Sequence, residues 1–396
     1  MTEKEKKIDE ILSRGVIEVI DRSHLRKRLL SGKTLMVKLG IDPTSTAIHL
    51  GRAVVLLKLR DFQELGHKIV LILGTATGMI GDTSDKDSER PMLSKEQIKE
   101  NVRTYAEQAG KILDMKSVDV RFNEDWLGKL GYEEIGQHAD QFSLHEFIER
   151  DNIKKRLAAG KRVSLREVIY PLMVGYDSVA VGADVELGGI DQRFNLLAGR
   201  VLQSHVGQEP QDILMVNLIS GTDGRKMSSS WGNVITLTDK PDDMFGKVMS
   251  IGDHLMEQYF LHCTRVPIAQ IENILTGGNP RDAKLRLASE IVALYHGKDI
   301  AEKTRKDFVE TFSERKVPDH ISATPVAGNQ IGLMDFLVQS KNAKSKSDAR
   351  RKITQGGVEV DGKRITDTNF ILARGIHDGA TLKIGKHGFA KVTFEK

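Results

Sequence analysis

Apolar residues along this chain fall into short runs that alternate with segments of helical spacing. An apolar run over residues 34–39 leads into the turn-like segment 40–44, which predicts a strand that ends in a loop. Residues 50–65 form a broad apolar helical face that stops at Gly66, and residues 69–73 form a second apolar run. A strand, a helix and a strand in this order predict a βαβ unit with parallel strands.

The same alternation returns later in the chain. Residues 183–187 and 213–219 predict two more buried strands, separated by Gly188-Gly189 and a helix. Together these elements predict a doubly wound α/β domain with a parallel, Rossmann-like sheet, whose ligands bind beyond the carboxyl ends of the strands. Residues 94–160 are charged and have helical spacing, so we expect a helical insertion there.

The last third of the chain changes from helices to a small mixed unit. Residues 242–312 have helical spacing throughout, and residues 318–330 are expected to form a linker. Beyond them, residues 346–354 predict a helix, and residues 355–362 predict a turn, a short alternating strand and a second turn. This pattern is typical of a small α+β domain.

Length and charge support a division into domains. Because 396 residues exceed the usual size of one compact unit, we expect three domains, α/β, all-α and α+β, over residues 1–230, 231–320 and 331–396. The net charge is +4, but residues 331–396 alone carry +6 and the rest of the chain −2. A basic terminal domain favours a polyanionic partner, although a merely soluble basic domain has the same charge.

Cysteine content and hydropathy indicate the compartment. Cys263 is the single cysteine, so no intrachain disulfide can form, and no Cys/His cluster has the spacing of zinc ligands. The first seven residues are charged, and no uncharged stretch reaches the roughly 20 residues that span a bilayer. We therefore expect a cytoplasmic protein with no signal peptide and no membrane partner.

Two short segments have residue types suited to the phosphates of ATP. The first is Asp-Pro-Thr at 42–44 followed by His49-Leu-Gly51 at the start of a helix. A helix N-terminus offers free N–H groups and a positive dipole end to phosphate, and His49 can donate to a phosphate oxygen. Gly51 allows a flat base to approach the backbone. Alone, such a triplet is usually a turn with a structural histidine.

The second segment is Lys226-Met-Ser-Ser-Ser230, in a loop after the apolar run 213–219. A lysine in such a loop can close over pyrophosphate as charge builds up in the transition state, while serine hydroxyls and backbone N–H groups hold the loop. Alone, this segment could be a solvated loop. The two segments together, each beyond a buried strand, predict an ATP site.

In this order, the two segments resemble the HIGH and KMSKS signatures of class I aminoacyl-tRNA synthetases. Further segments resemble the bacterial tyrosyl-tRNA synthetases, namely residues 40–44, 78–82, 170–177 and 187–192. Residues 347–365 are similar to the S4 RNA-binding module. The resemblance spans nearly the whole chain and implies that tyrosine reacts with ATP to give tyrosyl-adenylate and pyrophosphate, and is then transferred to the 3′-terminal adenosine of tRNA(Tyr).

The resemblance also implies roles for individual residues. Asp177 would accept a hydrogen bond from the substrate phenol and so reject phenylalanine, because a buried acceptor without its partner is costly. The other residues implied to bind tyrosine are Gly40, Asp82, Tyr170 and Gln192. Those implied to bind ATP are Asp42, Thr44, His49, Gly51, Gly189, Asp191, Lys226, Met227 and Ser228. Those implied to assist the reacting phosphates are His49, Lys226, Lys86 and Arg90.

Partners follow from the same resemblance. Mg²⁺ is expected to enter with ATP, with no dedicated metal site in the protein. The family implies a homodimer through the α/β domain, with one tRNA across both subunits, and an anticodon-binding role for the helical domain. In the C-terminal domain, Arg350, Arg351 and Lys352 are expected to contact tRNA phosphates from an exposed helix.

Four positions depart from the family pattern. Val174 stands where many relatives have a glutamine that helps bind the substrate ammonium, and Lys38 stands where some have a tyrosine that reaches the substrate hydroxyl. Arg52 replaces the last histidine of HIGH and could bind phosphate instead. Ser229 replaces the second lysine of KMSKS, so the remaining cations near this loop are expected to carry more of the pyrophosphate stabilisation.

Several alternatives stay open at this point. Asp82 could cap a helix, Asp177 could be a solvated loop acid, and Gly188-Gly189 could be a tight turn. A tryptophan-specific relative shares the class I core, although Asp177 suits a phenol better and the S4-like module favours the tyrosine enzyme. A non-catalytic RNA-binding protein built on a decayed synthetase is compatible with the departures at Val174, Arg52 and Ser229.

Overall fold

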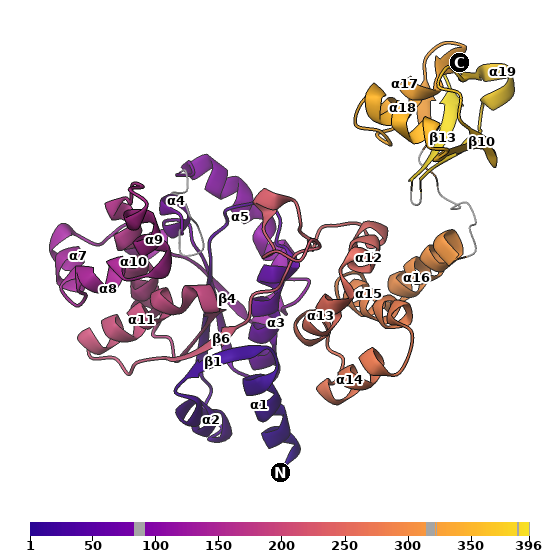
Figure 1. Cartoon of the computed structure of the whole chain (residues 1–396). Coiled ribbons are helices and arrows are strands. Elements are labelled where there is room, and N and C mark those ends of the chain that lie inside the picture. The colour runs from indigo at the N-terminus through magenta and orange to yellow at the C-terminus, as the bar shows by residue number, and fades with distance from the viewer. Residues whose placement is uncertain (83–91, 314–320, 322, 386–387, 396) are drawn as a thin grey trace. The chain divides into compact units, whose positions relative to one another are not determined.

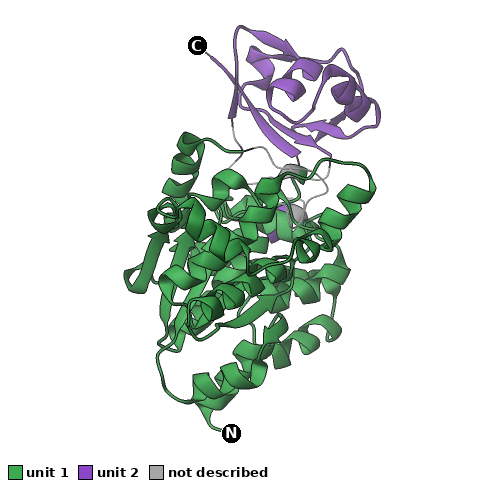
Figure 2. Cartoon of the chain, turned by 90° about the vertical axis from the view of Figure 1, so that its left-hand side faces the viewer, with its two compact units in different colours: residues 1–304 green, residues 305–396 purple. Residues whose placement is uncertain are grey.

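The computed structural model describes residues 1–82, 92–313, 321, 323–385 and 388–395. The chain divides into two compact units, Met1–Thr304 and Arg305–Lys396, and the boundary falls inside one helix, α16 (Lys298–Ser313) (Figure 2). Each unit is described by itself below.

Unit 1 is built on a sheet whose described strands number six, in the order β1-β6-β5-β2-β3-β4 (Figure 1). The strands are β1 Val16–Ile20, β2 Met36–Ile41, β3 Lys68–Leu73, β4 Val118–Phe122, β5 Val185–Gly189 and β6 Asp212–Val216. All neighbours are parallel except β1, which pairs antiparallel with β6 at one edge. The chain runs outward from β2 to β3 and β4 and then adds β5 and β6 on the other side of β2. The predicted doubly wound α/β fold is therefore confirmed, and the strand order reverses between β2 and β5.

Helices pack on both faces of this sheet (Figure 1). Helix α3 (Leu50–Glu64) buries Leu56, Leu59 and Phe62 completely and is followed by Gly66 at φ +85°, a backbone conformation that favours glycine after a helix. On the other face, α10 (Leu165–Val181) crosses α11 (Arg193–His205) closely. A Cβ on Gly175 would lie 2.9 Å from the Ala198 carbonyl carbon, so glycine is required where these two helices meet.

The segment expected to be a helical insertion, residues 94–160, contains a strand. Its helices are α5 Lys95–Ala109, α6 Glu124–Leu127, α7 Tyr132–Ala139, α8 Leu144–Ile148 and α9 Asp151–Ala158. Between α5 and α6, however, β4 adds to the sheet beside β3. The prediction was wrong there because β4 is a short edge strand with alternating apolar and polar residues, surrounded by longer segments of helical spacing. The N-terminal helices α1 (Glu3–Ser13) and α2 (Arg22–Leu30) flank β1, which the sequence pattern did not indicate either.

The predicted helical stretch after the sheet is confirmed. It comprises α12 Pro241–Ser250, η4 Asp253–Leu255, α13 Met256–Cys263, α14 Ile268–Thr276, α15 Pro280–His296 and α16. Four short helical segments lie earlier in the unit: α4 Thr77–Ile80, η1 Met115–Ser117, η2 Ile190–Gln192 and η3 Ser229–Trp231. Arg14, directly after α1, joins this stretch to the N-terminus. Its guanidinium donates to four carbonyl oxygens around the end of α13, those of Phe260, Leu261, Thr264 and Val266, over 2.8–3.1 Å.

Unit 2 is a small α+β fold. Its described strands form a five-stranded sheet, β10-β9-β12-β13-β7, and a two-stranded sheet, β11-β8. The strands are β7 Ala323–Val326, β8 Gln330–Gly332, β9 Val358–Val360, β10 Lys363–Ile365, β11 Ile371–Ala373, β12 Thr381–Ile384 and β13 Gly388–Phe394. The helices are α17 Leu333–Gln339, α18 Lys346–Thr354 and α19 Arg374–His377. Leu333, Phe336 and Leu382 are fully buried in its core.

Two predictions for this region have different outcomes. Helix α18 has the predicted bounds, and β9 lies between Gly356 and Gly362, both at positive φ, as the turn–strand–turn pattern predicts. Residues 323–326, expected in a linker, instead form β7, which pairs parallel with β13. Pro325 favoured a linker, but β7 is an edge strand, where a missing N–H donor is tolerated.

Among the described residues, no helix has the length and apolar character needed to cross a bilayer.

We expect Arg14→Met to destabilise unit 1 by about 3 kcal/mol, because four carbonyl oxygens lose their donor and three of these hydrogen bonds are buried. Chemical denaturation measures the change. Arg26→Met is the matched control, since this arginine pairs with Asp9 at the surface and should change stability little. Equal losses in the two variants would contradict a special role for Arg14.

Candidate active site

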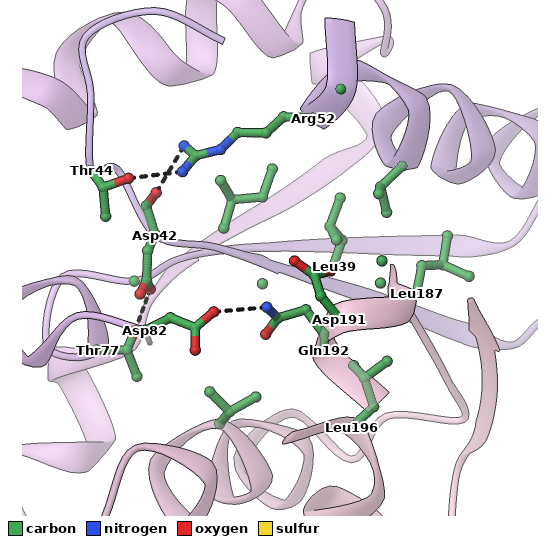
Figure 3. A pocket seen from close by; sticks show the side chains of 18 of the residues that line it. Leu39, Asp42, Thr44, Arg52, Thr77, Asp82, Leu187, Asp191, Gln192 and Leu196 are labelled. Carbon is green, nitrogen blue, oxygen red and sulfur yellow. Dashed lines mark hydrogen bonds between the residues drawn. The ribbon is translucent and has the colours of Figure 1, made fainter. Parts of the chain in front are cut away.

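A pocket of about 510 Å³ opens where the strand order reverses, at the carboxyl ends of β2 and β5 (Figure 3). Residues of both predicted motifs line it. The lining includes Gly40, Asp42, Thr44, His49, Gly51, Asp82, Tyr170, Asp177, Gly189, Asp191, Gln192, Lys226, Met227 and Ser228. Lys86 and Arg90 lie outside the described residues. The structure thus brings every described residue predicted for ATP or tyrosine into one pocket.

Main-chain pairing brings the two motifs together. The Leu50 N–H donates to the Ile235 carbonyl over 2.8 Å, and the Leu237 N–H donates to the Ile48 carbonyl over 2.9 Å. The segment after the serine-rich loop therefore lies against the start of α3. The Gly51 N–H also donates to the Met227 sulfur over 3.3 Å. The loop that carries Lys226 is held over the N-terminus of α3.

His49 is uncharged at neutral pH. It precedes α3, and burial, with the nearby cations of Arg52 and Lys226, lowers its pKa to about 3. Its Nδ1 is buried and has no hydrogen-bond partner among the described residues. A Cβ on Gly51 would lie 3.0 Å from this nitrogen. The glycine thus leaves room for the imidazole beside the helix N-terminus.

Lys226 reaches across the pocket to the end of β5. Its Nζ lies 3.1 Å from Asp191 Oδ2. Asn233 holds the loop, since its Nδ2 donates to the Lys226 carbonyl and its Oδ1 accepts from the Ser228 N–H over 3.1 and 2.9 Å. The loop is therefore an ordered turn that directs its lysine at Asp191, a carboxylate predicted to bind ATP.

Asp177 is buried on α10, so it is not a solvated loop acid. Its carboxylate accepts from Trp126 Nε1 over 2.8 Å and from Asn123 Nδ2 over 3.2 Å. Burial raises the pKa of Asp177 to about 7, and the Lys38 charge together with these two donors opposes the rise. An acceptor at this depth can recognise a hydroxyl group on a ligand that reaches it.

Asp42 and Tyr170 are hydrogen-bonded to each other. The Tyr170 hydroxyl donates to Asp42 Oδ2 over 2.9 Å, and Thr77 Oγ1 donates to Asp42 Oδ1 over 2.7 Å. Burial raises the pKa of Asp42 to about 6, although both donors favour its ionised form. A Cβ on Gly74 would lie 2.0 Å from Asp42 Oδ1, so glycine is required beside this carboxylate. A network therefore links the predicted ATP and tyrosine ends of the pocket.

Asp82 and Gln192 face each other across the pocket (Figure 3). Gln192 Nε2 donates to Asp82 Oδ2 over 2.8 Å, and Gln192 Oε1 accepts from Asn195 Nδ2 over 2.8 Å. This arrangement presents carboxylate and amide groups to a polar ligand between β5 and the chain after α4.

Arg52 is bound to the protein. Its guanidinium donates to the Thr44 hydroxyl over 2.8 Å and to the Asp42 carbonyl over 3.2 Å (Figure 3). It also donates to the Tyr105 hydroxyl over 2.5 Å. The side chain therefore braces the segment 42–44. This geometry explains why an arginine fits the position, and it leaves phosphate binding by Arg52 as a prediction.

Sequence patterns missed several residues of this site. Thr77, Asn123 and Trp126 belong to no recognised motif, and only the fold brings them to Asp42 and Asp177. Lys38, which the resemblance already placed at a substrate-contacting position, is fully buried at the pocket.

The three residues predicted to contact tRNA lie on α18 of unit 2. Arg350 and Arg351 are exposed, whereas Lys352 is half-buried. Lys352 Nζ donates to the Asn342 carbonyl over 2.6 Å, so it also holds the turn before α18. The two arginines are the members of this group that are open to a ligand.

Comparisons with known proteins agree over nearly the whole chain. The family model for class I tRNA synthetases (W and Y) matches residues 30–313, and the model for the tyrosine–tRNA ligase SYY-like C-terminal domain matches residues 313–382. The chain is 44% identical to a tyrosine–tRNA ligase of Carboxydothermus hydrogenoformans, over 98% of both chains. It is 43% identical to one of Thermotoga maritima, over 97% of this chain and 96% of that one.

Solved structures share the fold. A truncated mitochondrial tyrosyl-tRNA synthetase of Aspergillus nidulans superposes with a TM-score of 0.64 at 23% identity, over 77% of this chain and 94% of that one. A tyrosyl-tRNA synthetase of Archaeoglobus fulgidus complexed with L-tyrosine gives 0.59 at 21% identity, over 76% and 99%. With the family models and the close relatives, the conclusion is that this chain belongs to the class I tRNA synthetases, in the tyrosine–tRNA ligase family.

Proposed function

We propose that this chain is a tyrosine–tRNA ligase. It activates L-tyrosine with ATP to tyrosyl-adenylate, releases pyrophosphate, and transfers tyrosine to the 3′-terminal adenosine of tRNA(Tyr). One observation carries the proposal: a single pocket holds His49 and Lys226, suited to phosphates, together with the buried acceptor Asp177. The family membership gives the same activity.

The ATP half of the pocket stabilises charge. The tyrosine carboxylate attacks the α-phosphorus, and the bond to pyrophosphate breaks, so no protein nucleophile is required. The N–H groups at the start of α3 and a neutral His49 donate to phosphate oxygens, and Lys226 neutralises the leaving pyrophosphate. Asp191 binds the ribose. Mg²⁺ accompanies ATP as part of the substrate.

The other half selects the amino acid. Asp177 accepts the phenol O–H, while Asp82 and Tyr170 hold the substrate ammonium and Gln192 lies near its carboxylate. Phenylalanine would leave Asp177 without this bond. Because a buried acceptor without its partner is costly, the site rejects phenylalanine by a large factor. The printed names of the close relatives favour tyrosine over tryptophan.

The domain roles are proposed from the same family. The α/β region over 1–230 carries the chemistry, the helices over 231–320 read the anticodon, and the S4-like region over 331–396 binds tRNA through its backbone. A cytoplasmic location fits the requirement for ATP and tRNA. The single cysteine, Cys263, is buried and unpaired, as in a reducing compartment.

A homodimer is proposed through the α/β region. Exposed apolar side chains gather on the helices of the insertion and on α10: Tyr132, Leu144, Leu157, Leu165 and Ile169 are 42–97% exposed. Apolar side chains in such numbers are typical of a covered surface. Light scattering should give twice the 44.1 kDa mass of one chain, and a monomeric mass would contradict the dimer.

The function is tested by ATP–pyrophosphate exchange. Tyrosine should support exchange, and phenylalanine and tryptophan should not. Lys226→Ala should slow exchange by roughly 100-fold with little change in tyrosine affinity, because the lysine acts mainly on charge that develops in the transition state. Lys240→Ala, at an exposed lysine outside the pocket, is the control. An unchanged exchange rate in Lys226→Ala would reject the role of this lysine. If no amino acid supports exchange in the wild type, the non-catalytic RNA-binding alternative is favoured.

The role of unit 2 is tested in the full chain. Arg350→Glu/Arg351→Glu should lower kcat/KM for tRNA roughly tenfold and leave tyrosine-dependent exchange unchanged, since the substitutions remove two phosphate contacts. Aminoacylation kinetics at two salt concentrations provide the measurement. If tRNA charging survives intact, α18 needs another explanation.

A further inference from the structure

A buried ion pair lies at the tyrosine end of the pocket. Lys38 of β2 and Glu186 of β5 are direct partners in the parallel register, and Lys38 Nζ lies 2.9 Å from Glu186 Oε1. The two side chains are 0% and 2% exposed, and both residues line the pocket. Removing two charges from water costs several kcal/mol unless they are well paired, so a fully buried ion pair in the sheet requires a reason.

Lys38 also contacts the helical turn that carries Asp177. Its Nζ donates to Ser178 Oγ over 2.6 Å and lies 3.3 Å from the Val174 carbonyl. A lysine has three N–H donors, and these two oxygens with Glu186 provide three acceptors. Lys38 is thus engaged with the protein and does not replace a hydroxyl that would bond to the substrate directly.

The field at Asp177 comes from a small set of groups. The charged and titratable groups that face it are Lys38 from β2, Glu186 from β5 and Tyr170 from α10 itself. Lys38 lowers the pKa of Asp177, whereas Glu186 raises it by a smaller amount. The two members of the pair therefore act on Asp177 in opposite directions.

Among the other elements packed against this turn, α7 presents one titratable group: His138 contacts Tyr176, with ring centroids 5.0 Å apart. The groups that bond to Asp177 itself are neutral. Trp126 and Asn123, at α6, are uncharged donors to Asp177. Helix α11 presents Ala198, Gly199 and Leu202 to α10, and none of them titrates. Lys38 is the cation in this set.

We propose that Lys38 is a positioning residue for tyrosine recognition: its ammonium, fixed by Glu186 beside the helical turn of Asp177, favours the carboxylate form of Asp177, which accepts the phenol O–H. Recognition of the hydroxyl then depends on one acceptor and a cation behind it. The inference rests on the proposed function and names how its tyrosine site works.

The test is tyrosine affinity as a function of pH, measured by calorimetry on the full chain. In Lys38→Met the pH at which affinity is half lost on acidification should rise by about one unit, which weakens binding at pH 7 roughly fivefold. In Glu186→Gln this midpoint pH should fall, and tyrosine binding at pH 7 should equal that of the wild type or be up to about twofold tighter. A pair with only a structural role would weaken affinity in both variants at every pH, and that result would overturn the proposal.

Further variants keep the test decisive. Lys38→Arg retains the charge and should retain the wild-type pH profile. The double variant Lys38→Met/Glu186→Gln removes both members of the ion pair, so it replaces Lys38→Met in the test if that single variant does not fold. The pH at which its tyrosine affinity is half lost should still rise above the wild-type value, but by less than in Lys38→Met. An unchanged or lowered midpoint in the double variant would overturn the proposal.

Amino acid selectivity gives a second readout. In Lys38→Met the preference for tyrosine over phenylalanine should narrow at pH 7 and recover at pH 9, where Asp177 is ionised in both proteins; a preference that narrows equally at both pH values would overturn the proposal. If the wild type does not activate tyrosine, the proposed function itself fails. If it does, while the two single variants shift in the same direction, only the role of Lys38 fails.

Discussion

The pairing of residues 48–50 with residues 235–237 is the constraint on which the site depends. These segments lie far apart in the sequence, and two main-chain hydrogen bonds fix one against the other. The first segment continues into α3, whose N-terminus points at the pocket. The second follows the loop of Lys226. Without this pairing, the helix would offer its N–H groups and the loop its lysine to different regions of solvent.

The pocket is electrostatically prepared before any ligand binds. Burial raises the pKa values of Asp42 and Asp177, and hydrogen-bond donors offset part of this cost at each carboxylate. His49 is held neutral, so it contributes a donor without adding positive charge beside Lys226. A site with fixed donors and acceptors needs little reorganisation when charge develops during reaction, which is how most of the stabilisation in such reactions arises.

Much of this arrangement could be predicted from the sequence, because strong local patterns set it. The βαβ unit, the helical stretch after residue 241 and α18 have periodicities long enough to identify. The missed strands β1, β4 and β7 are short edge strands, and Pro325 hides β7. The partners of Asp177 and the Lys38–Glu186 pair could not be predicted, since sequence spacing does not show which strands are neighbours. A pair across β2 and β5 becomes visible only when the strand order is known.

The contact between Lys226 and Asp191 has a consequence for ligand selection. In the free protein the two groups are paired, so a small anion that binds Lys226 competes with Asp191, and a nucleoside that binds Asp191 competes with Lys226. A nucleotide with a phosphate chain supplies substitutes for both at once. Free phosphate can replace only the partner of Lys226, and adenosine can replace only the partner of Asp191, whereas ATP can replace both. The ion pair therefore favours ATP over either fragment.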